Sequence, residues 1–319
     1  MKSSLRLSRR SLAALGSLFL AVSSSTALAG PPAIDTTPAA PEPNKFLQSF
    51  VSFDATNFFD TSFSDIPVSL SVTRYSGYGE FKFRLSPDWM LKLFTYGDLS
   101  LYNFRAFDQP FTGPMRNAYY ANVDLTLAYT FAPGWAIVGG GRIRSAASTD
   151  ASFGDSVTGG GILAIKKSFF NGGIDLTLGA SYTTRLSRSG QVLPYLDFDV
   201  NVLPSFVKIP VNVLLLYNGG MLTYRVTDNL SLIALGQYDS RAYRLAASSS
   251  IPKGVWSEYG VLVGGGFGWT PNKKNWSLTV LGGYEVFRNV QTFANNGFKT
   301  SDLDVNPTPF IRLDFHASF

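Results

Sequence analysis

The sequence predicts an all-β fold, a transmembrane antiparallel up-and-down β-barrel of about 12 strands. One observation is the strict alternation of the C-terminal segment. Ile311, Leu313 and Phe315 fall on one face of a strand. Arg312 and Asp314 fall on the other, because successive side chains in a strand point to opposite sides. The second observation is an export signal at the opposite end of the chain. Together they indicate a wall strand whose outer face meets lipid and whose inner face meets water.

The export signal occupies residues 1–29. It has a basic start, an apolar core over residues 12–22, and small residues at Ala27 and Ala29 for cleavage. The apolar core is shorter than the roughly 18 residues that a spanning helix needs. Residues 30–45 contain five prolines among small and polar residues, which predicts a flexible periplasmic tether. The barrel itself is expected to cover residues 46–319.

Composition excludes several classes of function. The chain has 27 Lys and Arg against 22 Asp and Glu, but the signal holds four of the basic residues and none of the acidic ones. The mature chain is therefore nearly neutral, and its charge gives no reason to expect a nucleic-acid partner. There is no cysteine, which excludes disulfides, thiolate metal sites and thiol nucleophiles. We expect no cofactor and no metal.

The body of the chain repeats one local pattern. Residues 89–99, 119–131 and 174–182 each alternate between apolar and polar side chains, as barrel and sandwich strands do. Aromatic residues flank short turns rich in Pro, Asp and Asn at 83–89, 129–135, 224–230 and 269–276. Longer polar segments lie between these turns, at 55–67, 105–117, 145–158, 185–192, 244–257 and 289–307. Short turns that alternate with long loops favour a membrane barrel over an exported soluble β-sandwich, the alternative fold.

The strand count is open between 12 and 14. Residues 195–202 read as one strand, but residues 209–226 fit either one long strand or a hairpin that turns at Asn218-Gly219-Gly220. The hairpin version gives 14 strands. Both ends of the chain in the periplasm require an even number.

These motifs resemble the outer-membrane β-barrels of Gram-negative bacteria. Phe319, with Phe315 and other apolar residues at alternate positions before it, is similar to the signal that barrel-insertion machinery reads. Residues 224–232, followed by Gly236, resemble an uncharacterised family of such barrels over roughly residues 46–319. The resemblance implies a location in the outer membrane, contact with its lipid, and the insertion machinery as an assembly partner. It implies no activity.

Catalytic chemistry has little support in the sequence. His316 is the only histidine, so a serine hydrolase site would have to use it, and a lone imidazole lacks the clustered ligands of a metal site. We expect His316 to be a lumen residue and the protein not to be an enzyme. Three glycine runs (139–141, 159–161 and 264–266) lack the strand-to-helix setting of a phosphate loop and are expected within strands.

Ionisable groups are costly in hydrocarbon, so those on the strands should face the lumen. The predicted lumen-lining residues are Lys82, Arg84, Lys92, Asp98, Asp124, Arg142, Arg144, Asp175, Asp197, Asp199, Glu285, Arg312, Asp314 and His316. They allow two interpretations, a water-filled pore or a narrow barrel plugged by ion pairs across the lumen.

Further arginines lie where strands lead into long loops. Arg185, Arg188, Arg241 and Arg244 are candidate contacts for lipopolysaccharide phosphates, which a guanidinium can bind with two parallel hydrogen bonds. Solvated loop stems are the alternative.

The sequence thus leads to two hypotheses about function. The first is a passive channel for small polar solutes with a mixed-charge lumen. The second is a closed structural or interaction barrel whose extracellular loops bind surface polysaccharide, lipid or protein. The sequence identifies neither the solute nor the loop ligand, and it does not give the oligomeric state.

Overall fold

A computed structural model describes residues 49–106, 113–169, 174–186, 190–200, 211–216, 219–271 and 275–318, with the backbone alone for 197–200, 211–216 and 219. The expected signal, the tether and Phe319 lie outside the described residues. The strands are β1 (Phe50–Ser62), β2 (Val68–Arg84), β3 (Trp89–Ala106), β4 (Asn117–Ala132), β5 (Trp135–Ser148), β6 (Val157–Phe169), β7 (Ile174–Thr183), β8 (Gln191–Val200), β9 (Val211–Leu216), β10 (Gly219–Arg225), β11 (Leu230–Arg244), β12 (Val255–Trp269), β13 (Trp276–Phe293), β14 (Lys299–Val305) and β15 (Thr308–Ser318). The short helix α2 (Phe153–Ser156) precedes β6.

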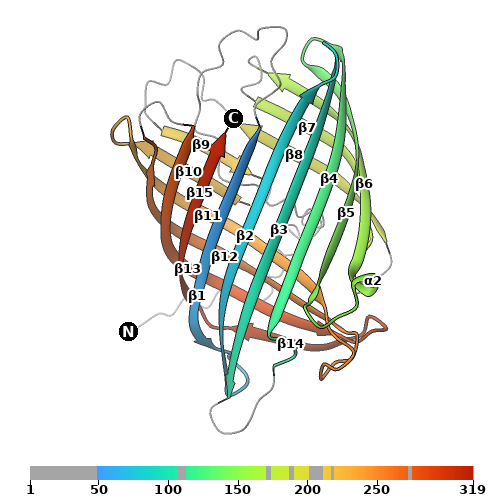
Figure 1. Ribbon diagram of the computed structural model, residues 1–319, viewed down its shortest axis with the longest axis vertical. Coiled ribbons are helices and arrows are strands. Elements are labelled where there is room, and N and C mark those ends of the chain that lie inside the picture. The colour runs from blue at the N-terminus through green and yellow to red at the C-terminus, as the bar shows by residue number, and fades with distance from the viewer. Residues whose placement is uncertain are drawn as a thin grey trace, which may run out of the picture.

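These strands form one antiparallel barrel (Figure 1). From β1 to β8 and from β9 to β13 each strand pairs with the next one in sequence, β13 pairs with β15, and β15 pairs with β1, so the two ends of the barrel chain lie side by side. Cα atoms of β8 and β9 come within 8 Å of one another, which brings the two ends of the hydrogen-bonded path together. Among the described strands β14 pairs with β13 and lies off the ring, and its Val305 also forms an isolated bridge with Phe63. The predicted all-β up-and-down barrel is therefore confirmed.

The ring contains the 14 strands of the alternative count. Within the described residues the difference from 12 arises at β9 and β10, which pair as a hairpin with Gly219 opposite Leu216. The predicted loops at 55–67 and 289–307 are also partly strand, because β1 continues to Ser62, and β13 and β14 form a hairpin. Polar strand ends can pair with each other in water as apolar ones do. Polarity alone therefore predicted that these strands end before they do in the structure.

The two ends of the barrel differ. Tight turns connect β2 to β3, β4 to β5 and β10 to β11, and in the first of these the Leu85 amide donates to the Trp89 carbonyl at 2.9 Å. The connections at the opposite end are mostly longer and carry α2 and β14, which both lie in the lower part of Figure 1. By the usual orientation of such barrels, the turn end is periplasmic and the loop end is extracellular.

The extracellular end is narrowed. β5 and β11 are separated around the ring by five strands, yet Arg244 of β11 pairs directly with Ala147 of β5. The ladder between β10 and β11 begins at Gly219 and Gln237, so β10 does not accompany β11 to its extracellular end. The strands β11–β13 bend across the barrel in Figure 1. At this end β5 and β11 therefore contact each other directly, without the strands β6 to β10 between them.

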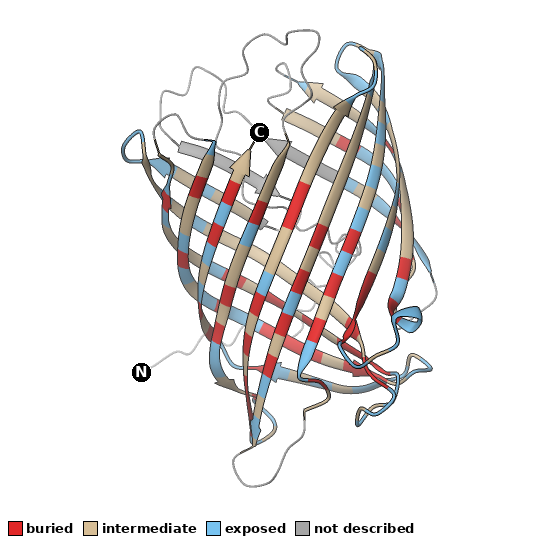
Figure 2. Cartoon of the chain, viewed as in Figure 1, coloured by how far each residue is buried: buried red, intermediate tan, exposed pale blue. Residues whose placement is uncertain are grey.

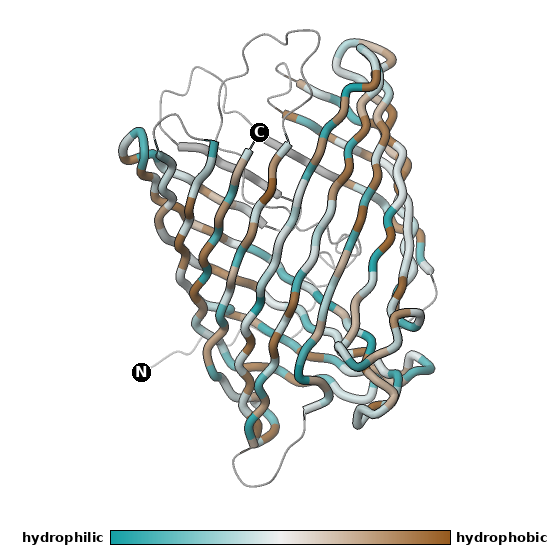
Figure 3. Tube along the Cα trace, in the orientation of Figure 1, coloured by the Kyte–Doolittle hydropathy of each residue, from teal (hydrophilic) through white to brown (hydrophobic). Residues whose placement is uncertain are grey.

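The outer face is apolar, as lipid contact requires. Along β4, exposed Val123 and Leu125 alternate with inward-facing Asn122 and Asp124. Figure 3 shows the same alternation of hydropathy along the strands. Exposed apolar side chains on outward positions of the other strands include Phe53, Ile137, Leu163, Ile165, Leu178, Val263, Phe267, Val280, Ile311 and Leu313. So wide an apolar surface is unusual for a soluble protein and is the lipid-facing band of a barrel.

Aromatic side chains gather near the periplasmic turns. Trp89 stacks on Tyr129 with ring centroids 4.7 Å apart, and Trp269 meets Trp276 edge to face at 5.2 Å. All four point outward by their register. Such rings mark the headgroup level of a membrane barrel. No helix in the described part of the chain is long and apolar enough to cross a membrane.

Candidate functional site

The interior of the barrel carries many of the ionisable side chains of its strands, although Lys167 lies on the outer face over the Trp135 ring. The predicted lumen residues that the strand registers place on the inward face are Lys82, Lys92, Asp98, Asp124, Arg142, Arg144, Asp175, Glu285, Arg312, Asp314 and His316. Arg84 shares their register but is exposed beside the β2–β3 turn. The side chains of Asp197 and Asp199 lie outside the described residues. Period-2 alternation assigned these residues to the inward face because a strand has two faces.

Some of the inward charges pair along the wall. The Arg142 guanidinium donates two hydrogen bonds to the Asp124 carboxylate, at 2.7 and 2.5 Å. Lys82 lies 2.8 Å from Glu80. These partners sit on the same strand or on adjacent strands, so they line the interior without crossing it.

Six other charged residues form a network that does cross the lumen. We call it the crossing network, and it consists of Arg74, Asp98, Asp239, Arg241, Glu258 and Arg288. Arg74 on β2 donates to Asp239 on β11 at 2.6 Å and also to Glu258 on β12. β2 and β11 are not neighbours in the ring, because β1, β15, β13 and β12 lie between them. These bonds therefore join opposite walls of the barrel.

Buried neighbours complete the crossing network. Glu258 also accepts a hydrogen bond from Arg288 at 2.6 Å and one from the Tyr102 hydroxyl at 2.7 Å. Its side chain is 3% exposed and that of Arg288 is 2% exposed. On the other side, Arg241 pairs with Asp98 of β3. Charges so deeply buried are tolerated only when they are paired.

An apolar core lies on the extracellular side of the crossing network. Leu70, Tyr102, Tyr243, Trp256 and Val290 are all buried in it, and the Tyr102 and Trp256 rings meet edge to face at 6.2 Å. We call this cluster the distal core. β2 runs from the extracellular end at Val68 toward the periplasm, so Leu70 lies further out than the network arginine of the same strand. Figure 2 shows buried residues concentrated in this half. The described lumen is closed there.

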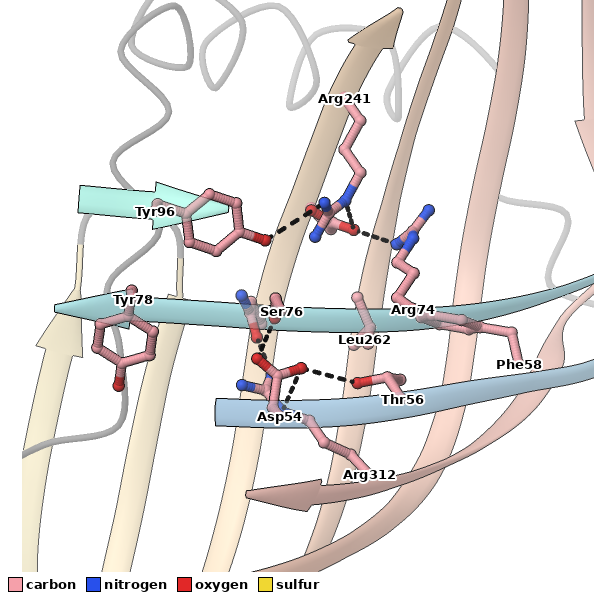
Figure 4. A pocket seen from close by; sticks show the side chains of 12 residues that line it. Asp54, Thr56, Phe58, Arg74, Ser76, Tyr78, Tyr96, Arg241, Leu262 and Arg312 are labelled. Atoms are coloured by element: carbon pink, nitrogen blue, oxygen red, sulfur yellow. Dashed lines mark hydrogen bonds and ion pairs between the residues drawn. The ribbon is translucent and has the colours of Figure 1, made fainter. Parts of the chain in front are cut away.

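A chamber remains on the periplasmic side of the distal core. It has a volume of about 530 Å³ including its open side. Figure 4 shows its lining: Asp54, Thr56, Phe58, Arg74, Ser76, Tyr78, Tyr96, Gln237, Asp239, Arg241, Leu262 and Arg312. The lining is unusual for its charge, since five of its side chains are ionisable: Asp54, Arg74, Asp239, Arg241 and Arg312.

His316 takes no part in a catalytic group of the described residues. It is buried on the inward face of β15, and its ring lies 5.2 Å from that of Phe50. Neither of its ring nitrogens has a hydrogen-bond partner among the described residues. In this part of the chain no cluster of three or more His, Asp and Glu side chains is placed to hold a metal ion.

The arginines proposed to contact lipopolysaccharide separate into different environments. The prediction that Arg241 contacts lipopolysaccharide is wrong. Arg241 lies on the same face of β11 as Asp239 and points into the lumen, where it pairs with Asp98 and Asp239. Arg244 donates hydrogen bonds to several loops. Arg185 is partly buried in the β7–β8 loop. Arg188 lies outside the described residues.

Arg244 joins several extracellular loops. Its guanidinium donates to the carbonyl oxygens of Asp155 at 3.1 Å, Lys253 at 2.7 Å and Leu186 at 2.5 Å. A weaker bond reaches the Asn295 side chain at 3.4 Å. One side chain thus connects the loops β5–β6, β7–β8, β11–β12 and β13–β14 over the narrowed end.

Sequence reasoning missed half of the site. Asp54, Arg74, Asp239, Glu258 and Arg288 were not among the predicted lumen residues. Period-2 alternation would have found the first four, since each alternates with outward apolar or small residues on its strand. Arg288 is different, because a bulge between β12 and β13 shifts the register at this position and exchanges the faces.

Comparison with known proteins assigns no family to the chain. No protein-family model matches the chain, and no curated protein sequence matches it. Among solved structures, an outer-membrane channel from Pseudomonas putida F1 is similar over 89% of this chain and 100% of its own, with 9% identity and a TM-score of 0.40. The monoaromatic hydrocarbon channel TodX (deltaS2 mutant) is similar over 88% of this chain and 91% of its own, with 10% identity and a TM-score of 0.39. LpxR from Salmonella typhimurium is similar over 84% of this chain and 99% of its own, with 8% identity and a TM-score of 0.30. These values support no conclusion about activity.

The architecture itself gives the location. An even-stranded antiparallel ring, with an apolar outer band, an aromatic rim near its short turns and longer loops at the other end, is the construction of outer-membrane proteins. The chain is an outer-membrane β-barrel.

Proposed function

We propose that this barrel is a gated channel for small polar solutes, held closed at its extracellular half in the conformation described. The observation that carries the proposal is the charged chamber, which ends against the crossing network and the distal core. A lumen of 14 strands is wider than the eight-stranded barrels that side chains fill outright, so its closure requires the bend of β11–β13 across the opening. A closure made by bending strands and loops can be reversed.

A second candidate is a permanently closed barrel whose loops bind lipopolysaccharide, surface polysaccharide or protein. The distal core favours it, because Tyr243 and Trp256 are packed like the interior of a soluble protein. The loops tied together by Arg244 would then present a fixed surface.

Single-channel conductance in a planar bilayer separates the two candidates. The test compares the refolded wild type with Trp256→Ala, which removes a ring that contacts both Tyr102 and Phe104. Trp135→Ala is the matched control, because that ring is exposed on the outer face near a periplasmic turn.

A gated channel predicts rare, discrete openings in the wild type and in Trp135→Ala, and at least tenfold more open time in Trp256→Ala. Folded protein that stays silent in all three forms would reject the channel and leave the closed interaction barrel. Gel mobility before and after heating, which differs between folded and unfolded barrels, checks that each variant is folded.

A further inference from the structure

The chamber offers both signs of charge to a solute. Of its three lining arginines, Arg312 and Arg241 are the more accessible, with side chains 16% and 9% exposed, and Arg74 is 5% exposed. Its exposed anionic groups are Asp239 at 13% and Asp54 at 10%. All four line the chamber. Neither sign dominates what a bound molecule would meet.

The two guanidinium groups keep hydrogen-bonding capacity. Arg312 donates through Nε to Asp314 at 2.8 Å and through Nη1 to Gln237 at 3.4 Å. Arg241 uses Nε for Asp239 at 3.1 Å, and Nη1 for Asp98 and Tyr96. In each case Nη2 has no partner among the described residues, and a guanidinium has five N–H donors in all. Both can therefore donate to a carboxylate in the chamber.

The carboxylates keep capacity as well. The bonds from Arg74 and Arg241 to Asp239 both end on Oδ2, so Oδ1 receives no donor from the described residues. Asp54 accepts from the hydroxyl groups of Thr56 and Ser76, and its contact with Arg312 is long, at 3.8 Å. In Figure 4 the Asp54 carboxylate lies among these groups at the chamber wall. An ionised carboxylate has about four acceptor positions, so each can accept from an ammonium group.

We propose that the chamber binds small zwitterionic solutes of the amino-acid class, with the solute carboxylate toward Arg241 and Arg312 and its ammonium toward Asp54 and Asp239. This assignment deepens the proposed channel function and rests on it, because the solute must reach the lumen. A zwitterion satisfies donors and acceptors together and brings no net charge into a partly desolvated space. A simple anion would accept hydrogen bonds from the arginines alone, and a simple cation would donate to the aspartates alone. Either would bring a net charge into the chamber.

Binding is tested separately from conduction. Purified mature protein in detergent is titrated with glycine, acetate and methylammonium, and saturation-transfer difference NMR reports weak binding of each. The variants are Arg312→Gln and Asp54→Asn, which remove one charge of each sign. Arg142→Gln is the matched control, because this guanidinium is also inward-facing and paired with an aspartate but does not line the chamber.

The proposal predicts that glycine binds at least tenfold more tightly than acetate or methylammonium. Both chamber variants should weaken glycine binding about tenfold, and Arg142→Gln should leave it unchanged. Acetate that binds as well as glycine would show an anion site and overturn the assignment, as would the absence of binding by all three. Arg312→Lys keeps the charge and tests binding where Arg312→Gln fails to fold. A silent barrel that still binds glycine would refute the channel but not the site.

Discussion

Replacement of Glu258 by glutamine tests whether the crossing network stabilises the closed barrel. The carboxylate is 3% exposed and accepts hydrogen bonds from Arg74, from Arg288 at 2.6 Å and from Tyr102 at 2.7 Å. Glutamine keeps the shape but removes the charge and replaces one acceptor by a donor. Removal of one member of a buried ion pair typically costs about 3–5 kcal/mol, because the partner is left without its counter-charge.

The lower end of that range applies here. Arg74 retains Asp239 at 2.6 Å, and Arg288 retains Glu285 at 3.4 Å, so neither guanidinium loses all its counter-charge. We expect Glu258→Gln to lower the free energy of unfolding by about 3 kcal/mol. The assay is urea unfolding of the protein in lipid vesicles, followed by tryptophan fluorescence.

The control for this experiment is Asp124→Asn. Its pair with Arg142 lies along the wall with side chains 14% and 20% exposed, so water can solvate the arginine that remains. We expect a loss of about 1 kcal/mol, as for partly exposed pairs. Equal losses in the two variants, or a loss below about 1 kcal/mol for Glu258→Gln, would refute the role given to the crossing network.

Three other predictions follow from the loops and strands. Arg244→Ala should release the extracellular loops, so externally added protease should cleave them several-fold faster, whereas unchanged cleavage would mean that Arg244 does not restrain them. Gly266→Ala should destabilise the barrel by more than 1 kcal/mol in the same urea assay, because its methyl would collide with the Val280 carbonyl, whereas Gly139→Ala should be tolerated, since open space surrounds that position. Burial opposes ionisation of Asp302, but hydrogen bonds, the largest from Lys299, outweigh it and hold its pKa below the usual value. The pairing of β14 with β13 should therefore weaken as pH falls below about 4, measured by hydrogen exchange, and Asp302→Asn should remove that dependence.

The fold was largely predictable from local sequence. Alternation placed Val123 outside and Asp124 inside, and a strand allows no third direction. The C-terminal strand was predicted for the same reason. What period-2 reasoning cannot supply is where strands bend, because bending depends on which side chains meet across the lumen. The contact between Arg244 and Ala147 links strands that local patterns place far apart.

The candidate site was predicted only in part, because local sequence does not show which side chains meet across the lumen. The sequence shows that Asp98 and Arg241 are ionisable, but it gave no signal that they would pair across the barrel. Arg241 was interpreted as a loop-stem residue because it lies near the end of its strand. In the structure, β11 continues beyond its neighbour β10, so this end of the strand faces the opposite wall and not the solvent.

The buried charges are the strongest reason to regard the closure as functional. The distal core already excludes water from the extracellular half, and apolar residues such as Leu70 and Val290 do so without a desolvation penalty. Ion pairs in the same region cost free energy that well-packed apolar side chains would not, so the crossing network is a poor means of stabilisation alone. It is, however, suited to a lumen that must close and also accept polar solutes. In the proposed channel, separation of the walls would make Arg74, Asp239 and Arg241 the hydrated lining of a pore, whereas an apolar seal would leave a dewetted barrier. The same residues would thus serve both the closed and the open state of the proposed channel.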